Sequence, residues 1–502
     1  MHMTLAVSYS RAHVGMQAPL VTIEVHISGG LPAFSIVGLA EAAVREAKER
    51  VRSAILNSQF DFPNGRITVN MAPADLPKQG GQFDLAIALG ILAASEQIQA
   101  DALKPFEWLG ELSLSGHLRK GPGALPAAMA CHNAQRALVC NINNAEEAAL
   151  VQGARIYGAT HLLEVCRMLK DKDFTLPSPT PSFEHNQKSY PDMADVKGQT
   201  SARRALEIAA AGKHNLLLFG PPGTGKTLLA SRLPGLLPPM TDAQALEVAA
   251  VQSVANLPLT WQQRPFRSPH HSASAAALIG GGSLPKPGEV TLAHQGVLFL
   301  DELPEFPRHV LDVLREPLES REVCISRAAR QCTFPAGFQL VAAMNPSPGG
   351  YGADDPRSKR YSPEQIQRYI SRLSGPFLDR IDLHIEVPTL PKELLMSDQP
   401  AESTAEIRVR VEQAWHAQQS RQGCSNSELQ GKQLEQICVV SDAEKKLLDQ
   451  AIDRLGLSAR AYHRILKVAR TVADLNGQKL IDKQAIIESL NCRQLEKLLG
   501  KL

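Results

Sequence analysis

The sequence lacks the marks of a disulfide framework, a membrane span or a secretory leader. Its eight cysteines are scattered, with no C-x-x-C pair, and this pattern favours reduced thiols. No window approaches the 18 or more apolar residues that a bilayer span requires. The first residues, MHMTLAVSYSRAHVG, have no basic segment followed by a long apolar core. We therefore expect a cytoplasmic protein with no membrane partner.

A strong charge of either sign is also missing. The chain has 53 Lys and Arg residues against 51 Asp and Glu residues, a formal net charge of +2. A nucleic-acid-binding protein usually carries a basic excess, although a ring-shaped protein can confine its basic residues to a channel. The net charge therefore neither supports nor excludes DNA as a partner.

The patterning divides the 502 residues into three parts and a linker. Residues 1–170 alternate strand-like and helix-like segments, such as Val21–Ile27, in which every second residue is apolar, and this predicts an α/β domain. Residues 171–191 are rich in Pro, Ser and charge, as in a linker. A second α/β domain is predicted for 192–391, and 392–502 has amphipathic helical patterning. No repeat period is present.

The segment LLLFGPPGTGKT has the pattern G-x-x-x-x-G-K-[ST] between an apolar strand and a helical run. That context is the one a phosphate-binding loop requires. Backbone amides of such a loop cradle phosphate oxygens, Lys226 reaches the β and γ phosphates, and the Thr227 hydroxyl binds Mg²⁺. The sequence thus predicts a site for ATP and Mg²⁺. The residues expected at the nucleotide are Gly220, Pro221, Pro222, Gly223, Thr224, Gly225, Lys226 and Thr227.

Two more apolar strands end in polar residues suited to the same chemistry. VLFLDE ends in Asp301 and Glu302, of which one carboxylate can hold the metal ion and the other can polarise a water for attack on the γ-phosphate. FQLVAAMN ends in Asn345, which is suited to orienting that water. Each strand end is weak evidence alone, and the phosphate-binding loop upstream gives it weight.

Two arginines are candidates for stabilising phosphoryl charge. SGPFLDRID places Arg380 near the end of the second domain, and LSARAYHRIL places Arg460 in the helical region. Such arginines are often supplied by another subunit or by a mobile lid. For either arginine judged alone, a solvated surface or a structural ion pair is the simpler explanation.

The segment SREVCISRAARQCTFP predicts two short strands around a turn, just before the strand that ends in Asn345. Arg321, Arg327 and Arg330 would project from or near this hairpin. Such cations contact phosphates without reading sequence, which suits a motor that travels along any DNA. The alternative is a solvated hairpin with incidental charges.

In this order, GPPGTGKT, VLFLDE, VAAMN, LDRID and LSARAYHRILKVARTVADL resemble the motifs of an AAA+ ATPase with an all-helical lid last. FRSPHHSASAAALIGGGSLPKPGEVTLAHQGVLFLDE is similar to the insertion that the magnesium-chelatase-like branch places before its Walker B strand. GLPAFSIVGLAEAAVREAKERV and PADLPKQGGQFDLAIALG resemble the N-terminal part of the YifB/ComM family. The resemblance covers essentially the whole chain.

The resemblance implies an α/β fold with a Lon-protease-like N-terminal domain, an AAA+ P-loop core with a parallel sheet, and a C-terminal helical lid. It also implies roles for seven residues: Lys226 and Thr227 as Walker A, Asp301 and Glu302 as Walker B, Asn345 as sensor 1, Arg380 as a trans-acting arginine finger and Arg460 as sensor 2. Members of this branch form homohexamers that share each ATP site between neighbours. The hairpin would then point into the central channel.

Family members are implicated in natural transformation, as ring helicases that drive branch migration during integration of incoming DNA by homologous recombination. The partners that this resemblance implies are single-stranded or branched DNA, further copies of the chain, and recombination proteins.

The chain departs from its relatives at two places. Aligned on Pro77 and Lys78, the Lon nucleophile falls at Gln82 and the activating lysine at Leu125. Because neither side chain can do that chemistry, the loop is interpreted as scaffold and not as a protease site. Ser347 and Gly349 stand where many relatives carry cysteines, so we expect no structural zinc.

The adjacent histidines His270 and His271 invite a metal interpretation. In an extended segment they would point to opposite sides, and no third ligand stands at a suitable spacing. Hydrogen-bonding or loop-packing roles are therefore expected.

Three other functions stay open. A protein-remodelling motor like the ATPase subunit of magnesium chelatase would share the core, although the N-terminal part favours YifB/ComM. An ATP-dependent protease is opposed by Gln82 and Leu125. In a nucleotide-gated scaffold without translocation, Asp301 and Glu302 would serve only to time assembly.

Overall fold

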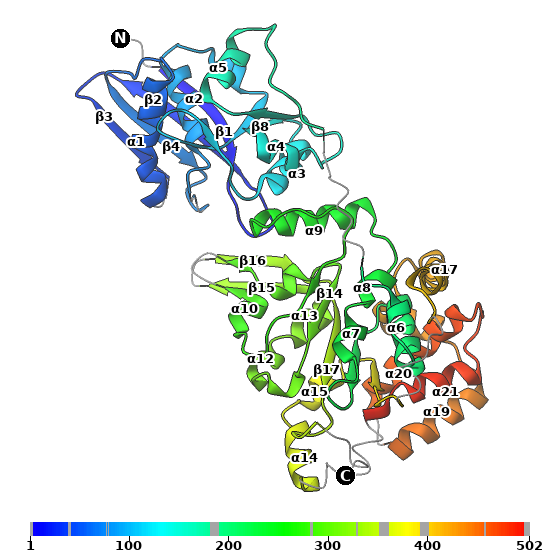
Figure 1. The fold of residues 1–502 in the computed structure, drawn as a ribbon. Helices are drawn as coiled ribbons and strands as arrows, with labels where there is room; N and C mark the ends of the chain where they lie inside the picture. Colours follow the sequence, from blue (N-terminus) through cyan, green and yellow to red (C-terminus); the bar gives the residue numbers. More distant parts are fainter. Residues whose placement is uncertain are drawn as a thin grey trace.

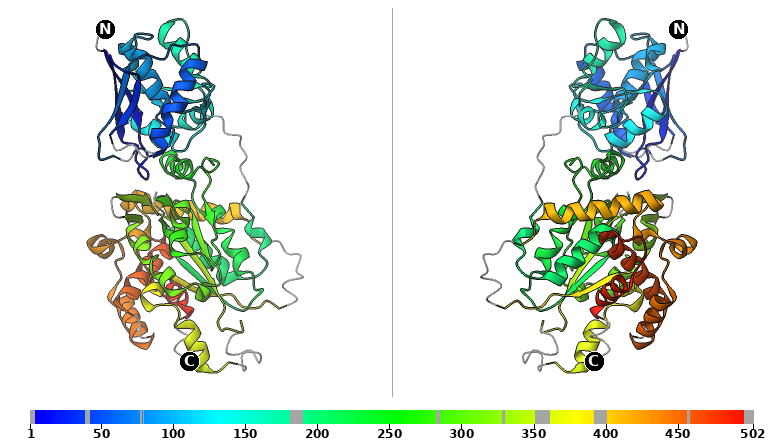
Figure 2. Two further views of the ribbon diagram at one scale, coloured as in Figure 1. Left: turned by 90° about the vertical axis from the view of Figure 1, so that its left-hand side faces the viewer. Right: turned by 90° about the vertical axis from the view of Figure 1, so that its right-hand side faces the viewer.

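The computed structural model describes residues 4–38, 42–76, 78, 80–180, 190–281, 285–327, 330–350, 361–391, 401–455 and 458–495. The chain forms two lobes, with helix α9 (Asp242–Val254) lying between them (Figure 1). The C-terminal helices gather beside the second lobe, and both side views show the same arrangement (Figure 2). In the described part of the chain, no helix has the length and apolar character needed to cross a membrane.

The N-terminal lobe contains two larger sheets and the two-stranded sheet β6–β7. The first has the order β1-β2-β4-β3 and is antiparallel except for the β3–β4 pair, and the second is the parallel sheet β5-β8-β9. Helix α2 is buried along its whole length and contacts β1, β2 and β5. The elements are β1 (Thr4–Arg11), β2 (Leu20–Ser28), β3 (Ala33–Val37), α1 (Ala42–Asn57), β4 (Arg66–Ala72), α2 (Asp84–Ala94), β5 (Phe106–Leu109), β6 (Glu111–Leu112), β7 (Leu118–Arg119), α3 (Ala124–Asn133), β8 (Ala137–Asn141), α4 (Ile142–Ala148), β9 (Ile156–Ala159) and α5 (Leu162–Lys170).

The alternation predicted for the second strand is confirmed over most of its length. Val21, Ile23 and Val25 are fully buried in β2, whereas Ile27 is only partly buried. The segment predicted as linker begins inside this lobe: Leu176 is buried in its core, and the amide of Gly158 donates to the carbonyl of Pro177 at 2.9 Å. Composition missed this packing because the segment is polar apart from a few apolar side chains.

The second lobe is organised by a five-stranded sheet, with strand order β11-β14-β17-β10-β18 and every neighbour parallel. This agrees with the expected parallel-sheet core. Its elements are α6 (Thr200–Gly212), β10 (Leu216–Phe219), α7 (Lys226–Ala230), α8 (Leu233–Leu236), α9, β11 (Phe266–Arg267), α10 (Ala275–Ile279), β12 (Gly280–Gly281), β13 (Lys286–Pro287), α11 (Glu289–Leu292), β14 (Val297–Leu300), α12 (Arg308–Asp312), α13 (Arg315–Ser320), β15 (Glu322–Arg327), β16 (Arg330–Pro335), β17 (Gln339–Met344), α14 (Pro363–Ile370), α15 (Gly375–Leu378) and β18 (Leu383–Glu386).

Successive residues of the inner strands enter two different cores. In β10, Leu216 and Leu218 pack with α6 and the C-terminal helices, whereas Leu217 and Phe219 pack on the opposite face with α12 and the β15–β16 hairpin. Strands β14 and β17 divide in the same way. Because both faces are covered, the strands are continuous apolar runs, as is typical of parallel strands.

The C-terminal part is helical, as its patterning predicted. It comprises α17 (Thr404–Gln422), the short 3₁₀ helix η5 (Asn426–Glu428), α18 (Gly431–Ile437), α19 (Asp442–Leu455), α20 (Ala459–Leu475) and α21 (Lys483–Asn491). Helices α17 and α20 pack against α6 of the core. A turn of chain after α21 then closes on the sheet, where the amide of His384 donates to the carbonyl of Cys492 at 2.6 Å.

The two lobes are in contact. Helix α3 packs on α9, where the amide of Gly123 donates to the carbonyl of Ser253 at 3.2 Å. Val14 and Met16, in the loop after β1, pack against the core that includes the β15–β16 hairpin. The N-terminal lobe therefore rests on the same elements that precede the strand ending in Asn345.

A buried ion pair in the N-terminal lobe gives a stability test. Glu107 is fully buried and accepts from Arg11 at 2.5 and 2.7 Å. Glu107→Gln leaves the Arg11 cation without its counter-charge, so we expect the free energy of unfolding to fall by about 3 kcal/mol. Urea denaturation followed by tryptophan fluorescence measures the change. The control is Asp101→Asn, which removes an exposed pair with Lys104 and should have a much smaller effect, because solvent screens that pair; equal losses would contradict the prediction.

Candidate ATP-binding site

The loop between β10 and α7 has the shape that a phosphate cradle needs. Gly223 and Gly225 have φ of 77° and 90°, a backbone region that L side chains rarely adopt. A Cβ at Gly220 would lie 2.2 Å from the carbonyl oxygen of Val387, whereas a Cβ at Gly223 would meet nothing within 4 Å. One end of the loop is thus packed against β18, and its middle leaves space for phosphate oxygens.

Lys226 lies at the centre of the predicted set. Its Nζ donates to the carbonyls of Gly220 and Pro221 at 2.7 and 2.9 Å and to Oδ1 of Asn345 at 3.1 Å. Burial lowers the pKa of this lysine, and nearby Asp301 opposes that shift. The structure therefore brings Lys226 and Asn345, the residues expected as Walker A and sensor 1, within hydrogen-bonding distance, because β10 and β17 are parallel neighbours.

The residues predicted to hold Mg²⁺ also meet. Thr227 Oγ1 donates to Oδ2 of Asp301 at 2.8 Å, so a hydroxyl and a carboxylate oxygen lie side by side next to the loop. Mg²⁺ prefers oxygen ligands and is commonly bound by one or two protein groups together with substrate phosphates. The donor set fits that ion.

Glu302 is positioned by an unusual backbone conformation and by His271, whose partner the sequence did not predict. Its φ is 53°, in the left-handed region, and its amide donates to Oδ1 of Asp301 at 2.9 Å. Oε2 of Glu302 lies 3.0 Å from Nδ1 of His271. The carboxylate that would polarise water is therefore held by a histidine from the loop after β11.

The prediction that His270 and His271 point to opposite sides is wrong. Their ring centroids are 4.0 Å apart. The segment is a turn and not extended: the amide of Ala273 donates to the carbonyl of His270 at 2.9 Å, and Nδ1 of His270 lies 2.8 Å from the Ser272 hydroxyl. The expected hydrogen-bonding role is confirmed for His270, which bonds Ser272, whereas His271 makes a close contact with the Glu302 carboxylate.

Arg380 lies far from Lys226 in the same chain. Its carbonyl accepts from Nδ2 of Asn215 at 3.0 Å, and Asn215 directly precedes β10, whereas the phosphate-binding loop follows that strand. The strand spans about 15 Å between these ends. The Arg380 side chain is 8% exposed, with Nη2 2.6 Å from Glu319 and Nη1 donating to the Pro376 carbonyl at 2.5 Å.

Arg460 lies at that same amino-terminal edge. It is exposed and lines a cavity of about 930 Å³ together with Asn215 and Asp382, the residues that precede β10 and β18. The other basic side chains at this cavity are Lys213, Arg321, His463, Arg464 and Lys467. Burial, then repulsion from Arg321 and Arg264, lowers the pKa of Lys213 to about 7. The structure thus separates both arginines from Lys226, Asp301 and Asn345.

The predicted hairpin is confirmed as the antiparallel pair β15–β16, in which Arg327 is paired with Arg330. The side chains of these two arginines lie outside the described residues. Arg321 does not project with them: it precedes β15 in a left-handed conformation and forms an ion pair with Glu428 of η5. Its side chain joins the base of the hairpin to the helical part, a contact across 107 residues that local sequence does not reveal.

The loop that resembles a protease site is occupied by scaffold contacts. Nζ of buried Lys78 donates to the carbonyls of Gly38 and Pro73, Nε2 of Gln82 donates to the carbonyl of Arg11 at 3.2 Å, and Leu125 is fully buried in α3. Burial raises the pKa of nearby Asp84 to about 6, although Arg50 pairs with it. No nucleophile and base meet at these positions.

At the positions where relatives carry cysteines, Ser347 is buried and Gly349 packs against the ring of Tyr361. Residues 351–360 lie outside the described part of the chain.

A glycine-rich loop after a parallel strand, with an amide residue at the end of the adjacent strand and acidic residues at the end of the next one, defines a P-loop protein. Three family comparisons agree. Residues 192–395 match "Magnesium chelatase, subunit ChlI", residues 23–144 match "Subunit ChlI of Mg-chelatase" and residues 401–493 match "Magnesium chelatase, subunit ChlI C-terminal".

The chain belongs to the YifB/ComM family of magnesium-chelatase-like AAA+ proteins. It is 53% identical to "Competence protein ComM" of Haemophilus influenzae over 100% of this chain and 99% of that protein. It is 48% identical to YifB of Escherichia coli over 99% and 98%. The "Magnesium-chelatase 38 kDa subunit" of Rhodobacter capsulatus is 26% identical over 34% of this chain and 54% of that protein. This family membership indicates ATPase activity.

The His271 contact leads to a kinetic prediction. His271→Ala frees the Glu302 carboxylate, so kcat for ATP hydrolysis should fall about 10-fold, because a general base works only when positioned. ATP affinity should stay within about two-fold, since His271 contacts neither the loop nor Asp301. The matched control is His270→Ala, which should retain kcat. A fall in ATP affinity as large as the fall in kcat would contradict this role.

Proposed function

We propose that the protein is a ring-forming, ATP-driven DNA motor that moves branch points during integration of transforming DNA by homologous recombination. The main observation in support of this proposal is that the candidate catalytic residues lie at two opposite edges of the sheet. Lys226, Asp301 and Asn345 lie at the carboxyl edge of the sheet, whereas Arg380 and Arg460 lie at its amino edge. An ATP site that needs both sets must be shared between two subunits, and head-to-tail sharing gives a ring when the rotation between subunits closes.

The residues at the carboxyl edge act within one subunit. Gly220–Gly225 and Lys226 would bind the phosphates, and Thr227 and Asp301 would hold Mg²⁺, which neutralises developing phosphate charge when bound. Glu302, held by His271, would polarise the attacking water, and Asn345 would orient it. The hydrogen bond from Lys226 to Asn345 supports coupling between phosphate state and β17.

The neighbouring subunit would supply Arg380 and Arg460. In the free chain Arg380 is ion-paired with Glu319, so assembly has to exchange this carboxylate for phosphate oxygens. Arginine suits that exchange because its guanidinium binds carboxylate and phosphate in the same bidentate geometry. Closing the ring would then also complete each ATP site for hydrolysis.

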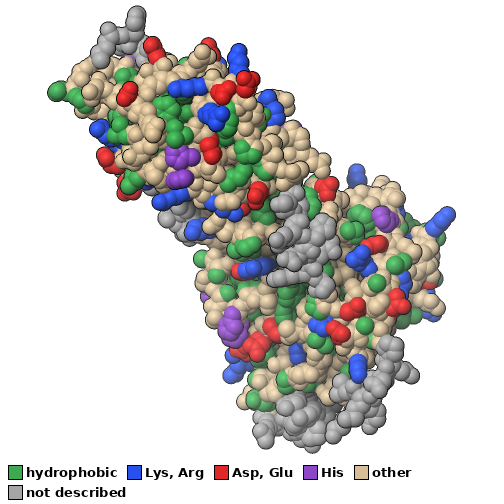
Figure 3. All heavy atoms as spheres, turned by 45° about the horizontal axis from the view of Figure 1, so that its top comes forward, with side chains coloured by type: hydrophobic (Ala, Val, Ile, Leu, Met, Phe, Trp, Pro, Cys, Tyr) green, Lys and Arg blue, Asp and Glu red, His purple; other side chains and the backbone are tan. Residues whose placement is uncertain are grey.

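DNA binding is assigned to Arg327 and Arg330 of the hairpin. The face in Figure 3 carries Lys and Arg intermixed with Asp and Glu and shows no continuous basic field, which agrees with a net charge of +2. A homohexamer contains six copies of the hairpin. Two arginines per chain can therefore line a channel without making the outer surface basic. Arg321 is left out of this set, since Glu428 already neutralises it.

The N-terminal lobe would serve as a Lon-like scaffold without protease activity, because Gln82 and Leu125 supply neither nucleophile nor base. Its contacts with α9 and with the core of the hairpin support a role in holding the hairpin or docking recombination proteins. Access to chromosomal DNA and ATP would place the protein in the cytoplasm.

A magnesium-chelatase-like protein-remodelling ATPase is the second candidate. It is favoured by the matches to the magnesium-chelatase subunit families over three segments. The full-length likeness to a competence protein supports the DNA motor more strongly, because the magnesium-chelatase 38 kDa subunits match only about a third of the chain.

The first test measures ATP hydrolysis without DNA, with single-stranded DNA and with a four-way junction. DNA should stimulate hydrolysis, and the junction should be resolved into duplex products. Lys226→Ala removes phosphate binding and Glu302→Gln removes water activation, so both variants should lose each activity. If neither DNA changes the rate of ATP hydrolysis, the DNA-motor proposal fails and the protein-remodelling ATPase becomes the leading candidate.

The hairpin is tested by salt dependence. Arg327→Ala with Arg330→Ala should weaken binding to single-stranded DNA and reduce the slope of log K against log salt by about 1.4 for each hairpin that contacts the strand, because each cation that neutralises a phosphate of a single strand contributes about 0.7 to that slope. ATP hydrolysis without DNA should persist. Arg119→Ala, an exposed arginine of the N-terminal lobe, serves as the charge control, and an equal reduction of the slope there would exclude the hairpin as the DNA-binding element.

A further inference from the structure

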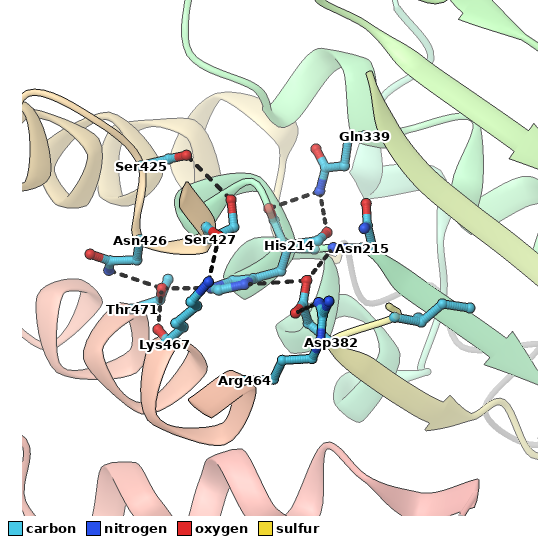
Figure 4. Close-up of polar contacts among 12 residues, drawn as sticks. His214, Asn215, Gln339, Asp382, Ser425, Asn426, Ser427, Arg464, Lys467 and Thr471 are labelled. Atoms are coloured by element: carbon cyan, nitrogen blue, oxygen red, sulfur yellow. Dashed lines mark hydrogen bonds and ion pairs between the residues drawn. The ribbon is translucent and has the colours of Figure 1, made fainter. Parts of the chain in front are cut away.

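The backbone of Arg380 is fixed by a buried carboxylate two residues further on. Asp382 is 3% exposed, and its Oδ1 accepts from Nη1 of Arg464 at 2.6 Å. Its Oδ2 accepts from the Asn215 amide at 2.9 Å and lies 3.6 Å from Nδ1 of His214. Figure 4 shows these side chains converging on Asp382 from the core and from the helical part.

Two of these partners also hold Arg380 itself. Nδ2 of Asn215 donates to the Arg380 carbonyl at 3.0 Å, and Nη1 of Arg464 donates to the same oxygen at 3.2 Å. One guanidinium nitrogen thus contacts both Asp382 and Arg380. Any movement of Arg464 must shift the backbone that carries the arginine finger.

Arg464 belongs to α20, the helix that also carries Arg460. The same helix is tied to the core by Thr471, whose hydroxyl lies 2.7 Å from Nε2 of His214, and to η5 by Lys467, which donates to the Ser427 carbonyl at 3.0 Å. The two proposed trans-acting arginines are therefore connected through α20 and Asp382.

Burial makes this connection stiff. Burial alone would raise the pKa of Asp382, but Arg464 and His214 outweigh it and hold the pKa well below its usual range. The carboxylate consequently keeps its charge throughout the neutral pH range. Solvent would screen an ion pair at the surface and leave it mobile, whereas buried charged groups have few alternative arrangements.

We infer that Asp382 and Arg464 are positioning residues that set the Arg380 finger according to the position of helix α20, so that each helical lid controls hydrolysis in the neighbouring subunit. This inference rests on the proposed sharing of ATP sites. Neither residue reaches the nucleotide bound by its own chain, because both lie at the amino edge of the sheet.

The test combines Asp382→Asn with subunit mixing. A finger displaced by an ångström costs about 100-fold in rate, so Asp382→Asn homo-rings should lose about 100-fold in kcat with ATP affinity retained. These subunits are mixed before assembly with an equal amount of Lys226→Ala subunits, which have an intact finger and a defective loop. In a random ring, about a quarter of the interfaces then combine an intact loop with an intact finger. Hydrolysis should recover towards that fraction of the wild-type rate.

Glu207→Gln is the matched control. Glu207 is 4% exposed and likewise links the core to the helical part, through Arg204 and Arg410, but it contacts nothing near Arg380. Glu207→Gln rings should keep wild-type kcat. If Asp382→Asn does not fold, as judged by circular dichroism, Arg464→Lys replaces it, because lysine keeps the charge but cannot bridge both oxygens in the same way.

An Arg380→Ala and Lys226→Ala mixture separates the two levels of inference. If hydrolysis does not recover in this mixture, the ATP site is not shared between subunits, and the inference fails with it. Recovery there without recovery for the Asp382→Asn mixture would show that Asp382 acts within its own subunit and would overturn the positioning role. Wild-type kcat in Asp382→Asn homo-rings would overturn it as well.

Discussion

Burial of the parallel sheet on both faces is the constraint on which the second lobe depends. Each residue of β10 is committed to one of two apolar cores, so no charged group can stand within the strand. Polar chemistry is restricted to the two edges, where the strands begin and end. The carboxyl edge collects Lys226, Asp301, Glu302 and Asn345, and the amino edge collects a second set. The length of β10 keeps the two sets apart.

The two edges differ in how their charges are held. At the carboxyl edge, Lys226 and Thr227 have partners that substrate oxygens can replace, such as loop carbonyls and the exposed side of Asp301. At the amino edge, the Asp382 carboxylate is buried and accepts from Arg464 and from the Asn215 amide. This difference suits a division of labour in which one edge exchanges ligands and the other transmits position.

Two polar side chains of the N-terminal lobe are likewise held by groups of the protein itself. Its loop at Lys78 and Gln82 is closed by hydrogen bonds to backbone carbonyls, and Leu125 belongs to an apolar core shared with α9. The polar atoms of Lys78 and Gln82 are thus bonded within the chain. The lobe instead contributes a large contact to α9 and to the hairpin that precedes the sensor strand.

The sequence by itself determined the elements and the residues of the phosphate site, because strand period, glycine loop and strand-end polarity are local patterns. Lys226 meets Asn345 because β10 and β17 are parallel neighbours. Asp301 follows β14, the next strand beyond β17, and reaches Thr227 at the same edge of the sheet. Only the tertiary structure decided that His271 holds Glu302, that Arg321 pairs with Glu428, and that Asp382 joins Arg464 to Arg380. These contacts join segments 31 to 107 residues apart, and no local period encodes which distant segment will lie beside a given side chain.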